Sequence, residues 1–228
     1  MPKKTIVMSV GGSLISPNAI DVNFLIGFRK VILNFIKKGN RVIIITGGGD
    51  TARSYQKAAR QVNRKVSLAD LDWIGIAATK VNAELVRAIF GSDAHQRIII
   101  NPGQAIRTNK KVLTGGGYEP GMSSDADAVI IAKTHGAKTI INLSNITYVY
   151  DKDPKKYKNA KPQKEMTWKE FRKLVGNVWV PGAHLPFDPV ASRMAAQAKM
   201  RLVIMKGNDL KNVENFLQNK PFIGTVIS

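Results

Sequence analysis

The sequence of 228 residues contains no cysteine, which excludes disulfide bonds, thiolate catalysis and cysteine zinc sites. Histidine is also scarce, and His95, His135 and His184 lack the spacing of metal ligands. No apolar run approaches the roughly 20 residues needed to cross a bilayer. The run after Lys3 and Lys4 is too short for a secretion signal. We therefore expect a soluble, cytoplasmic protein without a histidine metal site.

Acidic residues are few: 16 Asp and Glu stand against 35 Lys and Arg, which gives a formal charge of +19. Such a charge attracts anionic small molecules and any polyanion. The basic residues spread along the whole chain, with a denser run at residues 152–164, and aromatic residues make up only 7% of the sequence. Because the alternation of basic and aromatic residues typical of a base-stacking surface is missing, we expect any nucleic-acid binding to be non-specific.

A hydrophobic content of 44% is enough for a sizeable core, and we expect a single domain over residues 1–228. Strand-like apolar runs alternate with segments of helical spacing, which is typical of a mainly parallel sheet with helices on both faces. The predicted strands are residues 5–10, 42–46, 97–100, 111–114, 139–143 with 149–150 as its extension, 202–205 and 224–228. The predicted helices are residues 20–38, 51–60, 68–90, 124–135, 167–175, 188–199 and 209–217, and a loop is expected at 151–164.

Three glycine turns directly follow predicted strands, at residues 11–12, 47–49 and 115–117. The turn at 47–49 opens a helix, and the first turn of a helix presents unpaired N–H groups and the positive end of its dipole to an anion. Arg53 is expected in that first turn, with its side chain leaning back toward a phosphate bound over the turn. Since the carboxyl ends of parallel strands meet at one edge of a sheet, the three turns are expected to face one crevice.

In order and spacing, the short motifs of this chain resemble the amino acid kinase family, and within it the archaeal branch of UMP kinases (uridylate kinases). The motifs are residues 10–13, 47–49 with Arg53, 72–76 followed by Asn82 and Ala83, 116–125, Asn145 with Tyr150, 153–154 and 188–189. The resemblance implies a three-layer α/β/α sandwich in which MgATP is the phosphoryl donor, UMP the acceptor, and UDP and ADP the products of a step in pyrimidine biosynthesis. It also implies a homo-oligomer, a hexamer, with an acceptor-binding part at about residues 1–135 and an ATP-binding part at about 136–228.

The resemblance also implies a role for the motif residues. Arg53 and Asp125 would be catalytic, the first at the phosphates and the second ordering the cations around the transferring group. UMP would be bound by Gly48, Asp72 (at the ribose hydroxyls), Tyr118, Glu119, Pro120, Gly121, Met122, Ser123 and Ser124. ATP would be bound by Gly11, Gly12, Gly49, Arg53, Ser144, Asn145, Tyr150 and Asp153. Mg²⁺ is carried mainly by nucleotide phosphates and water in this chemistry, so we expect no protein metal ligands.

The chain departs from the family pattern at two places. Ser9 stands where many members carry a lysine that neutralises charge on the transferring phosphoryl group, so another cation is needed, with Arg53 the best candidate and Lys80 and Lys206 weaker ones. Residues 146–148, Ile-Thr-Tyr, replace the usual Val-Asp-Gly, which puts the affinity for the donor, or its choice, in question.

Several alternatives stay open on the sequence alone. Asp72 and Asp125 could be solvated helix carboxylates, Ser123 a simple helix cap and Tyr150 a core residue. The chain could be another small-molecule kinase of the same family, such as an isopentenyl phosphate or acylglutamate kinase, although Arg53 with Asp72 favours a nucleotide acceptor. It could also bind nucleotides without turnover, or act as a nucleic-acid-associated regulator.

Overall fold

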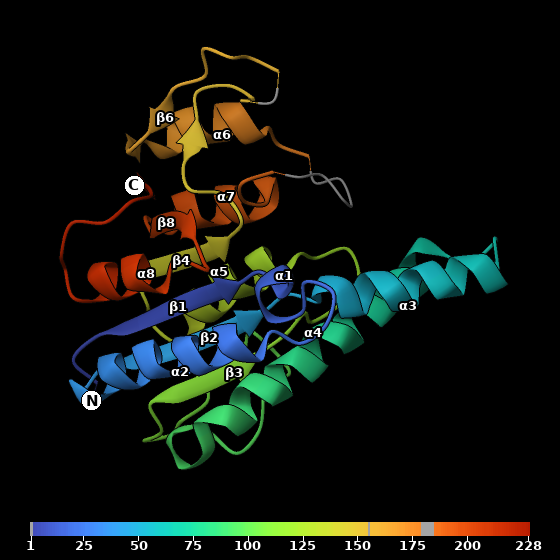
Figure 1. Cartoon of the computed structure of the whole chain (residues 1–228), viewed down its shortest axis with the longest axis horizontal. Coiled ribbons are helices and arrows are strands. Elements are labelled where there is room, and N and C mark those ends of the chain that lie inside the picture. Colours follow the sequence, from blue (N-terminus) through green and yellow to red (C-terminus); the bar gives the residue numbers. More distant parts are fainter. Residues whose placement is uncertain (1, 155, 179–184) are drawn as a thin grey trace.

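A seven-stranded sheet forms the middle layer of the protein, in the order β3-β2-β1-β4-β8-β9-β7. The structure, a computed structural model, describes residues 2–154, 156–178 and 185–228. The strands of this sheet are β1 (Thr5–Val10), β2 (Arg41–Thr46), β3 (Val112–Gly115), β4 (Thr139–Ser144), β7 (Glu165–Met166), β8 (Arg201–Lys206) and β9 (Thr225–Ile227). Helices cover both faces of the sheet (Figure 1), which confirms the predicted three-layer α/β/α fold.

The strands at the centre of the sheet are parallel, and their register brings their carboxyl ends to one edge. Val10 at the end of β1 pairs with Thr46 of β2 on one side and with Leu143 of β4 on the other. Ile45 of β2 pairs with Gly115 of β3. The segments that follow these four strands therefore begin side by side, as expected for a ligand-binding edge in a parallel sheet. Strand β9 runs antiparallel to β8 and parallel to β7.

One apolar core lies on each face of the sheet, because successive residues of each central strand point to opposite faces. Val42 and Ile44 join the core under α2 (Val22–Lys37), α4 (Leu68–Phe90) and α8 (Leu210–Leu217). Ile43 and Ile45 join the core under α5 (Ser124–Thr134), α6 (Trp168–Val175) and α7 (Pro189–Gln197). All four of these β2 residues are fully buried, so the sheet is covered on both faces.

Helix starts follow the capping rules expected from the sequence. Ser123 caps α5 by accepting a hydrogen bond from the Ala126 N–H, and Thr167 forms the predicted capping box with Glu170 at the start of α6. Asp188 caps α7, with proline at the first helical position. No helix within the described residues combines the length and apolar character that a bilayer crossing requires.

The structure corrects several boundaries. The predicted strand at 97–100 is wrong: this segment makes a single bridge, from Ile99 to Gly115, because it only touches the outer edge of β3 before the turn at 101–103. Residues 149–150 do not extend β4; β5 (Val149–Tyr150) pairs instead with β6 (Pro162–Gln163) inside the expected loop. The sequence reading also missed β7 and the short helix α1 (Gly12–Ile15), whose few residues carry no periodicity.

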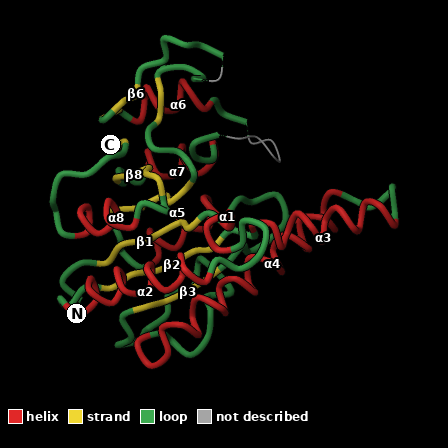
Figure 2. The backbone as a smooth tube through the Cα atoms, in the orientation of Figure 1, coloured by secondary structure: helices red, strands yellow, loops and turns green. Residues whose placement is uncertain are grey.

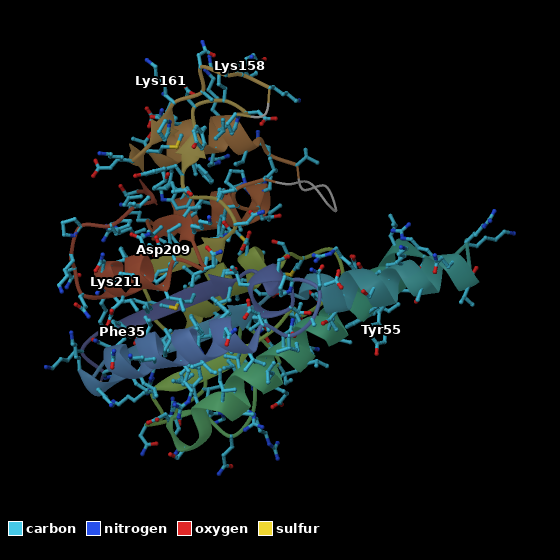
Figure 3. All side chains as sticks on the ribbon, in the orientation of Figure 1. Phe35, Tyr55, Lys158, Lys161, Asp209 and Lys211 are labelled. Carbon is cyan, nitrogen blue, oxygen red and sulfur yellow. The ribbon has the colours of Figure 1, made fainter. Side chains whose placement is uncertain are left out.

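Helix α3 (Gly49–Val62) extends beyond the body of the protein (Figure 1, Figure 2), although it packs on α4 at its base. None of its residues is buried. Figure 3 shows Tyr55 on this helix, whereas Lys158 and Lys161 lie in the lobe above the sheet that β6 and α6 form. A 3₁₀ turn, η1 (Gly91–Asp93), follows α4. Helix α3 therefore offers an exposed surface on all sides that α4 does not cover.

Candidate active site

The first two glycine turns interlock, backbone against backbone, at the carboxyl ends of β1 and β2. A Cβ atom on Gly12 would lie 2.6 Å from the carbonyl carbon of Gly47 and closer still to the nitrogen of Gly49. The contact is mutual, because a Cβ on Gly47 would lie 2.6 Å from the Gly12 nitrogen. Any side chain at Gly12 or Gly47 would push the turns apart. Glycine is thus required here for close approach rather than only for a tight turn.

Helix α3 begins at Gly49, two residues earlier than predicted, and the turn before it is held by side-chain contacts. Gly49 has a φ of +64°, a conformation that favours glycine. The amide of Asn82 on α4 donates to the carbonyl oxygen of Gly47 at 2.8 Å and of Gly48 at 3.3 Å. These contacts fix the orientation of the helix N-terminus, where the first N–H groups have no partner within the helix.

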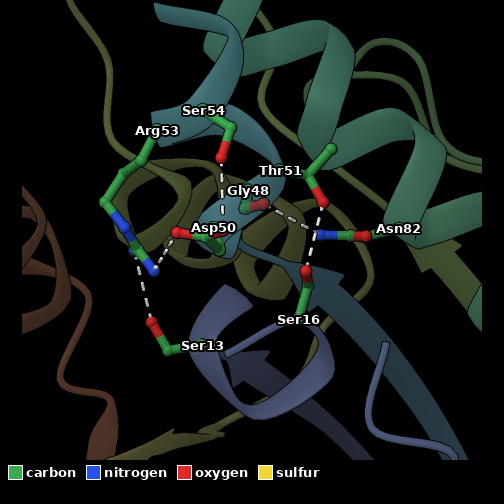
Figure 4. A network of polar contacts seen from close by, with 8 residues as sticks. All are labelled: Ser13, Ser16, Gly48, Asp50, Thr51, Arg53, Ser54 and Asn82. Atoms are coloured by element: carbon green, nitrogen blue, oxygen red, sulfur yellow. Dashed lines mark hydrogen bonds and ion pairs between the residues drawn. The ribbon is translucent and has the colours of Figure 1, made fainter. Parts of the chain in front are cut away.

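Arg53 leans back toward the N-terminus of α3, as expected for a helical side chain. Its guanidinium donates to Ser13 Oγ at 3.4 Å and lies 3.5 Å from Asp50 Oδ1 (Figure 4). The side chain remains 55% exposed. Because α3 starts at Gly49, Arg53 opens the second turn rather than lying in the first. The guanidinium therefore bridges the elements that follow β1 and β2, with room to turn toward an anion.

The third glycine turn, at the end of β3, packs against α4. Gly117 N–H donates to Thr79 Oγ1 at 2.7 Å, and a Cβ on Gly116 would lie 2.5 Å from the same oxygen. Thr46 Oγ1, at the end of β2, donates to the Thr79 carbonyl oxygen at 2.8 Å. Thr79 thus ties the third turn to the strand end that carries the second. The described contacts join the first two turns directly, and they tie the third turn to the end of β2 both through α4 and through a weak bond from Thr46 Oγ1 to the Gly115 carbonyl oxygen at 3.4 Å.

Asp125, which was predicted to be catalytic, contacts residues of β1 and β4 near the carboxyl ends of these strands. Its Oδ1 accepts hydrogen bonds from Ser9 Oγ at 2.9 Å and from the Asn142 amide at 3.4 Å. Its Oδ2 accepts from the Asp188 N–H at 3.3 Å. Removal from water raises the pKa of Asp125 to about 6; the bonds from Ser9 and the Asp188 N–H oppose the rise, and the Asp188 charge adds to it. Asp125 is partly buried and holds three hydrogen bonds, so it is not a freely solvated helix carboxylate, and its catalytic role stays a prediction.

Asp72 on α4 contacts the loop that was predicted to enclose UMP. Its Oδ2 accepts a hydrogen bond from the Gly121 N–H at 3.1 Å. Gly121 has a φ of +81°, and Ser123 ends the loop as the cap of α5. The remaining loop residues of the prediction are Glu119, which is exposed, and Tyr118, Pro120, Met122 and Ser124, which are partly buried. The structure brings Asp72 and this loop together, and their role in binding stays a prediction.

The residues predicted to bind ATP follow β4 and lie beside the first glycine turn. Gly11 N–H donates to the Leu143 carbonyl oxygen at 2.9 Å, and Ser144 Oγ accepts a weak contact from the Ile146 N–H at 3.4 Å. Asn145 is exposed and Tyr150 half-buried, so Tyr150 is not a core residue. Asp153 lies further along, in the exposed segment after β5. Ser144 thus adjoins Gly11, and Asn145 follows it in the chain.

A hollow of about 530 Å³ opens along α3 and is lined by Arg53, Gln56, Lys57, Arg60, Gln61 and Arg64. Of the predicted site residues, only Arg53 lines it. Within the described ranges, no group of three His, Cys, Asp or Glu side chains could hold a metal ion. His184 lies outside the described residues.

Comparisons with known proteins identify the family of this chain. The profile of the amino acid kinase family matches residues 4–206. The chain belongs to the amino acid kinase family. The uridylate kinase of Thermoplasma volcanium is 33% identical over 226 residues, 98% of this chain and 97% of its own length. The uridylate kinase of Methanoregula boonei is 31% identical, over 94% of this chain and 91% of its own.

Solved structures of family members share the fold. The crystal structure of a uridylate kinase from Archaeoglobus fulgidus has a TM-score of 0.84 and 28% identity, and the match covers 98% of this chain and 99% of that one. The UMP kinase of Bacillus anthracis has a TM-score of 0.79 over 100% of this chain and 97% of its own, at 18% identity, which supports the fold alone.

The two departures from the family pattern have different surroundings. Ser9, at the position of the usual lysine, bonds Asp125 directly. Among the ion pairs found between described residues, none involves Asp125. Lys206 is exposed at the end of β8, and Lys80 is half-buried on α4. Residues 146–148 are partly buried between β4 and β5.

The sequence reading missed residues that hold the site together without a motif of their own. Asn82, Thr79 and Asn142 each donate to, or accept from, the turns or Asp125, as described above. Asn82 belonged to a quoted motif but received no role. The one available signal in the sequence for such residues was a polar residue on the buried face of a helix or strand. Burying a polar side chain without a hydrogen-bond partner is costly, so such a residue is expected to have a partner.

Proposed function

We propose that this chain is a uridylate kinase (UMP kinase), which transfers the γ-phosphoryl group of MgATP to UMP and gives UDP and ADP, a step of pyrimidine nucleotide biosynthesis. The observation that carries the proposal is the interlock of Gly12 with residues 47–49 beside Asp125. Phosphoryl transfer asks the protein mainly to position two phosphates and to stabilise charge, which fixed backbone N–H groups and a few cations do. Relatives that match over nearly their whole length bear the name uridylate kinase.

In this proposal the two substrates meet over the glycine turns. The donor is bound by Gly11, Gly12, Gly49, Arg53, Ser144, Asn145, Tyr150 and Asp153. The acceptor is bound by Gly48, Asp72, Tyr118, Glu119, Pro120, Gly121, Met122, Ser123 and Ser124. The acceptor part would be residues 1–135 and the donor part residues 136–228. Gly48 packs closely against α4: a Cβ atom added to it would lie 3.5 Å from the Gly75 carbonyl oxygen. This position supports an acceptor phosphate next to the helix that carries Asp72.

The catalytic work falls on two side chains. Arg53 would swing from Asp50 and Ser13 to the transferring group, a short movement for an exposed guanidinium that already lies at the start of α3. Asp125, held by Ser9, would orient the cations at the phosphates. Mg²⁺ prefers phosphate oxygens and retained water, so it would arrive with ATP and neutralise developing charge when bound.

A homo-oligomer, a hexamer by family resemblance, is part of the proposal, and it is supported by the exposed surface of α3 and α4. Tyr55 is 67% exposed, Val62 91%, Trp73 51% and Val81 62%, an unusual density of exposed large apolar side chains on two adjacent helices. Light scattering on wild type should give an oligomer mass, and Val62→Asp should lower it; an unchanged monomer mass for wild type contradicts this part. We also place the protein in the cytoplasm, in keeping with the lack of cysteine.

The charge of +19 gives a further, weaker expectation. Any complex with nucleic acid should be indifferent to sequence and should dissociate as salt rises, because phosphate contacts release counterions. A sequence-specific complex that survives high salt would instead support a role as a nucleic-acid-associated regulator.

The direct test is to incubate the purified chain with MgATP and UMP and to separate the nucleotides by chromatography. We expect one UDP for each ADP formed. If no ADP forms with any acceptor while calorimetry still detects UMP and ATP binding, the chain binds nucleotides without turnover.

A further inference from the structure

A second carboxylate on α5 lies beneath the acceptor loop, which we define as residues 116–123. Asp127 is fully buried, and its neighbours Ala126, Ala128 and Val129 belong to the apolar core. Its Oδ2 accepts a hydrogen bond from the backbone N–H of Tyr118 at 3.2 Å. Its Oδ1 has no hydrogen-bond partner among the described residues. The family motifs gave this residue no role.

The Tyr118 bond falls between two other anchors of the acceptor loop. On one side, Gly117 N–H is held by Thr79 Oγ1 at 2.7 Å. On the other, Gly121 N–H is held by Asp72 Oδ2 at 3.1 Å. Thus three successive parts of the loop backbone are each fixed by a side chain from α4 or α5, and Asp127 supplies the middle anchor from below. The loop then enters α5 through the Ser123 cap.

A carboxyl group is a costly choice at this position unless it serves a purpose. Burying a polar atom without a partner is unfavourable, and an aliphatic side chain among these neighbours would avoid that penalty. The charged groups that act on Asp127 are Lys80 of α4 and Glu119 of the loop, of opposite sign. An aliphatic residue, however, could not accept a hydrogen bond from the Tyr118 N–H, and that N–H would lose its acceptor. The geometry therefore links the burial of Asp127 to the shape of the loop.

We propose that Asp127 is a positioning residue for acceptor binding: its buried carboxyl group fixes the Tyr118 backbone and so holds the acceptor loop in the shape that encloses UMP. This inference rests on the proposed function, because it takes residues 116–123 as the acceptor loop. Asp127 does not itself reach the reacting atoms; it acts through Tyr118.

Steady-state kinetics of Asp127→Ala and Asp127→Asn test the proposal. Asp127→Ala should raise KM for UMP about tenfold, the effect of losing one buried hydrogen bond, and should change KM for ATP less than about twofold. Asp127→Asn keeps an oxygen that can accept the Tyr118 N–H, so its KM for UMP should stay within about threefold of wild type. Val129→Ala is the matched control, since it removes buried packing from the same helix and keeps the carboxyl group that accepts the Tyr118 N–H.

Amide hydrogen exchange gives a readout that does not depend on turnover. Peptides that cover residues 116–123 should exchange faster in Asp127→Ala than in wild type, and those of Asp127→Asn and Val129→Ala should not. If Asp127→Ala leaves both loop exchange and KM for UMP unchanged, or raises the KM values of UMP and ATP equally, the positioning role is wrong. If the loop exchanges faster but wild type does not phosphorylate UMP, the anchor stands and the proposed acceptor is at fault.

Discussion

Replacing Gly12 by alanine should separate the two glycine turns and abolish most of the activity. An added Cβ would lie 2.6 Å from the Gly47 carbonyl carbon and closer still to the Gly49 nitrogen, whereas ordinary contact begins near 3.4 Å, so the backbone must move by about 1 Å or more. Overpacking of this kind costs about 1–3 kcal/mol, and we expect the upper end because the clash is with backbone rather than with a flexible side chain. For a chain of this size that corresponds to a fall in Tm of about 6–12 °C. A displacement of about 1 Å among positioning groups costs about 100-fold in rate.

Thermal unfolding and a coupled assay of ADP formation measure the two effects of Gly12→Ala. Gly136→Ala is the matched control: a Cβ there meets open space, but its φ of +68° makes the substitution strained, at a cost of about 1–2 kcal/mol. It should therefore lower Tm by about 2–8 °C, a range that overlaps that of Gly12→Ala, and leave kcat/KM nearly unchanged. Wild-type kcat/KM in a folded Gly12→Ala variant would refute the reasoning, because the interlock would then not define the site.

Three further predictions follow from the same geometry. Arg53→Ala should lower kcat/KM by at least about 100-fold, the effect of losing one charge-stabilising group. Lys57→Ala on the same helix and Ser9→Ala should lower kcat/KM little, and steady-state kinetics of the three variants measure the difference. Asp72→Ala should weaken UMP by about 10- to 100-fold and ATP hardly at all in binding titrations, and equal losses would remove Asp72 from the acceptor site. Burial raises the pKa of Asp125 to about 6, so the folded state holds this proton more tightly than the unfolded chain does. The contribution of the protonated group to stability is therefore lost as pH rises from about 4 to about 6. Because asparagine does not titrate, the Tm of Asp125→Asn relative to wild type should increase over that range.

The sequence predicted the elements whose signal is local and strong. Central strands such as residues 42–46 are continuous apolar runs, and helix starts such as Asp188 carry their own caps. The segment at 97–100 has the same apolar character, but whether it pairs depends on the neighbouring edge of β3, which no local pattern encodes. Strands β6 and β7 have two residues each, too few for any period to appear.

For the candidate site, the sequence placed the residues but not their contacts. The glycine turns were expected at one edge of the sheet, and the parallel register puts them there. The interlock of Gly12 with residues 47–49 and the bond from Ser9 to Asp125 join segments far apart in the chain, so no spacing rule could have given them. The burial of Asp127 depends on the fold of the loop that covers it, and no local pattern encodes that fold.

The most direct test of the account is kcat/KM for a panel of acceptors with MgATP held constant. The panel consists of UMP, CMP, GMP, isopentenyl phosphate and an acyl amino acid. We expect UMP to have the highest value of the five. Faster turnover of CMP, GMP or an acceptor that is not a nucleotide, or the absence of turnover with all of them, would contradict the assignment as a uridylate kinase.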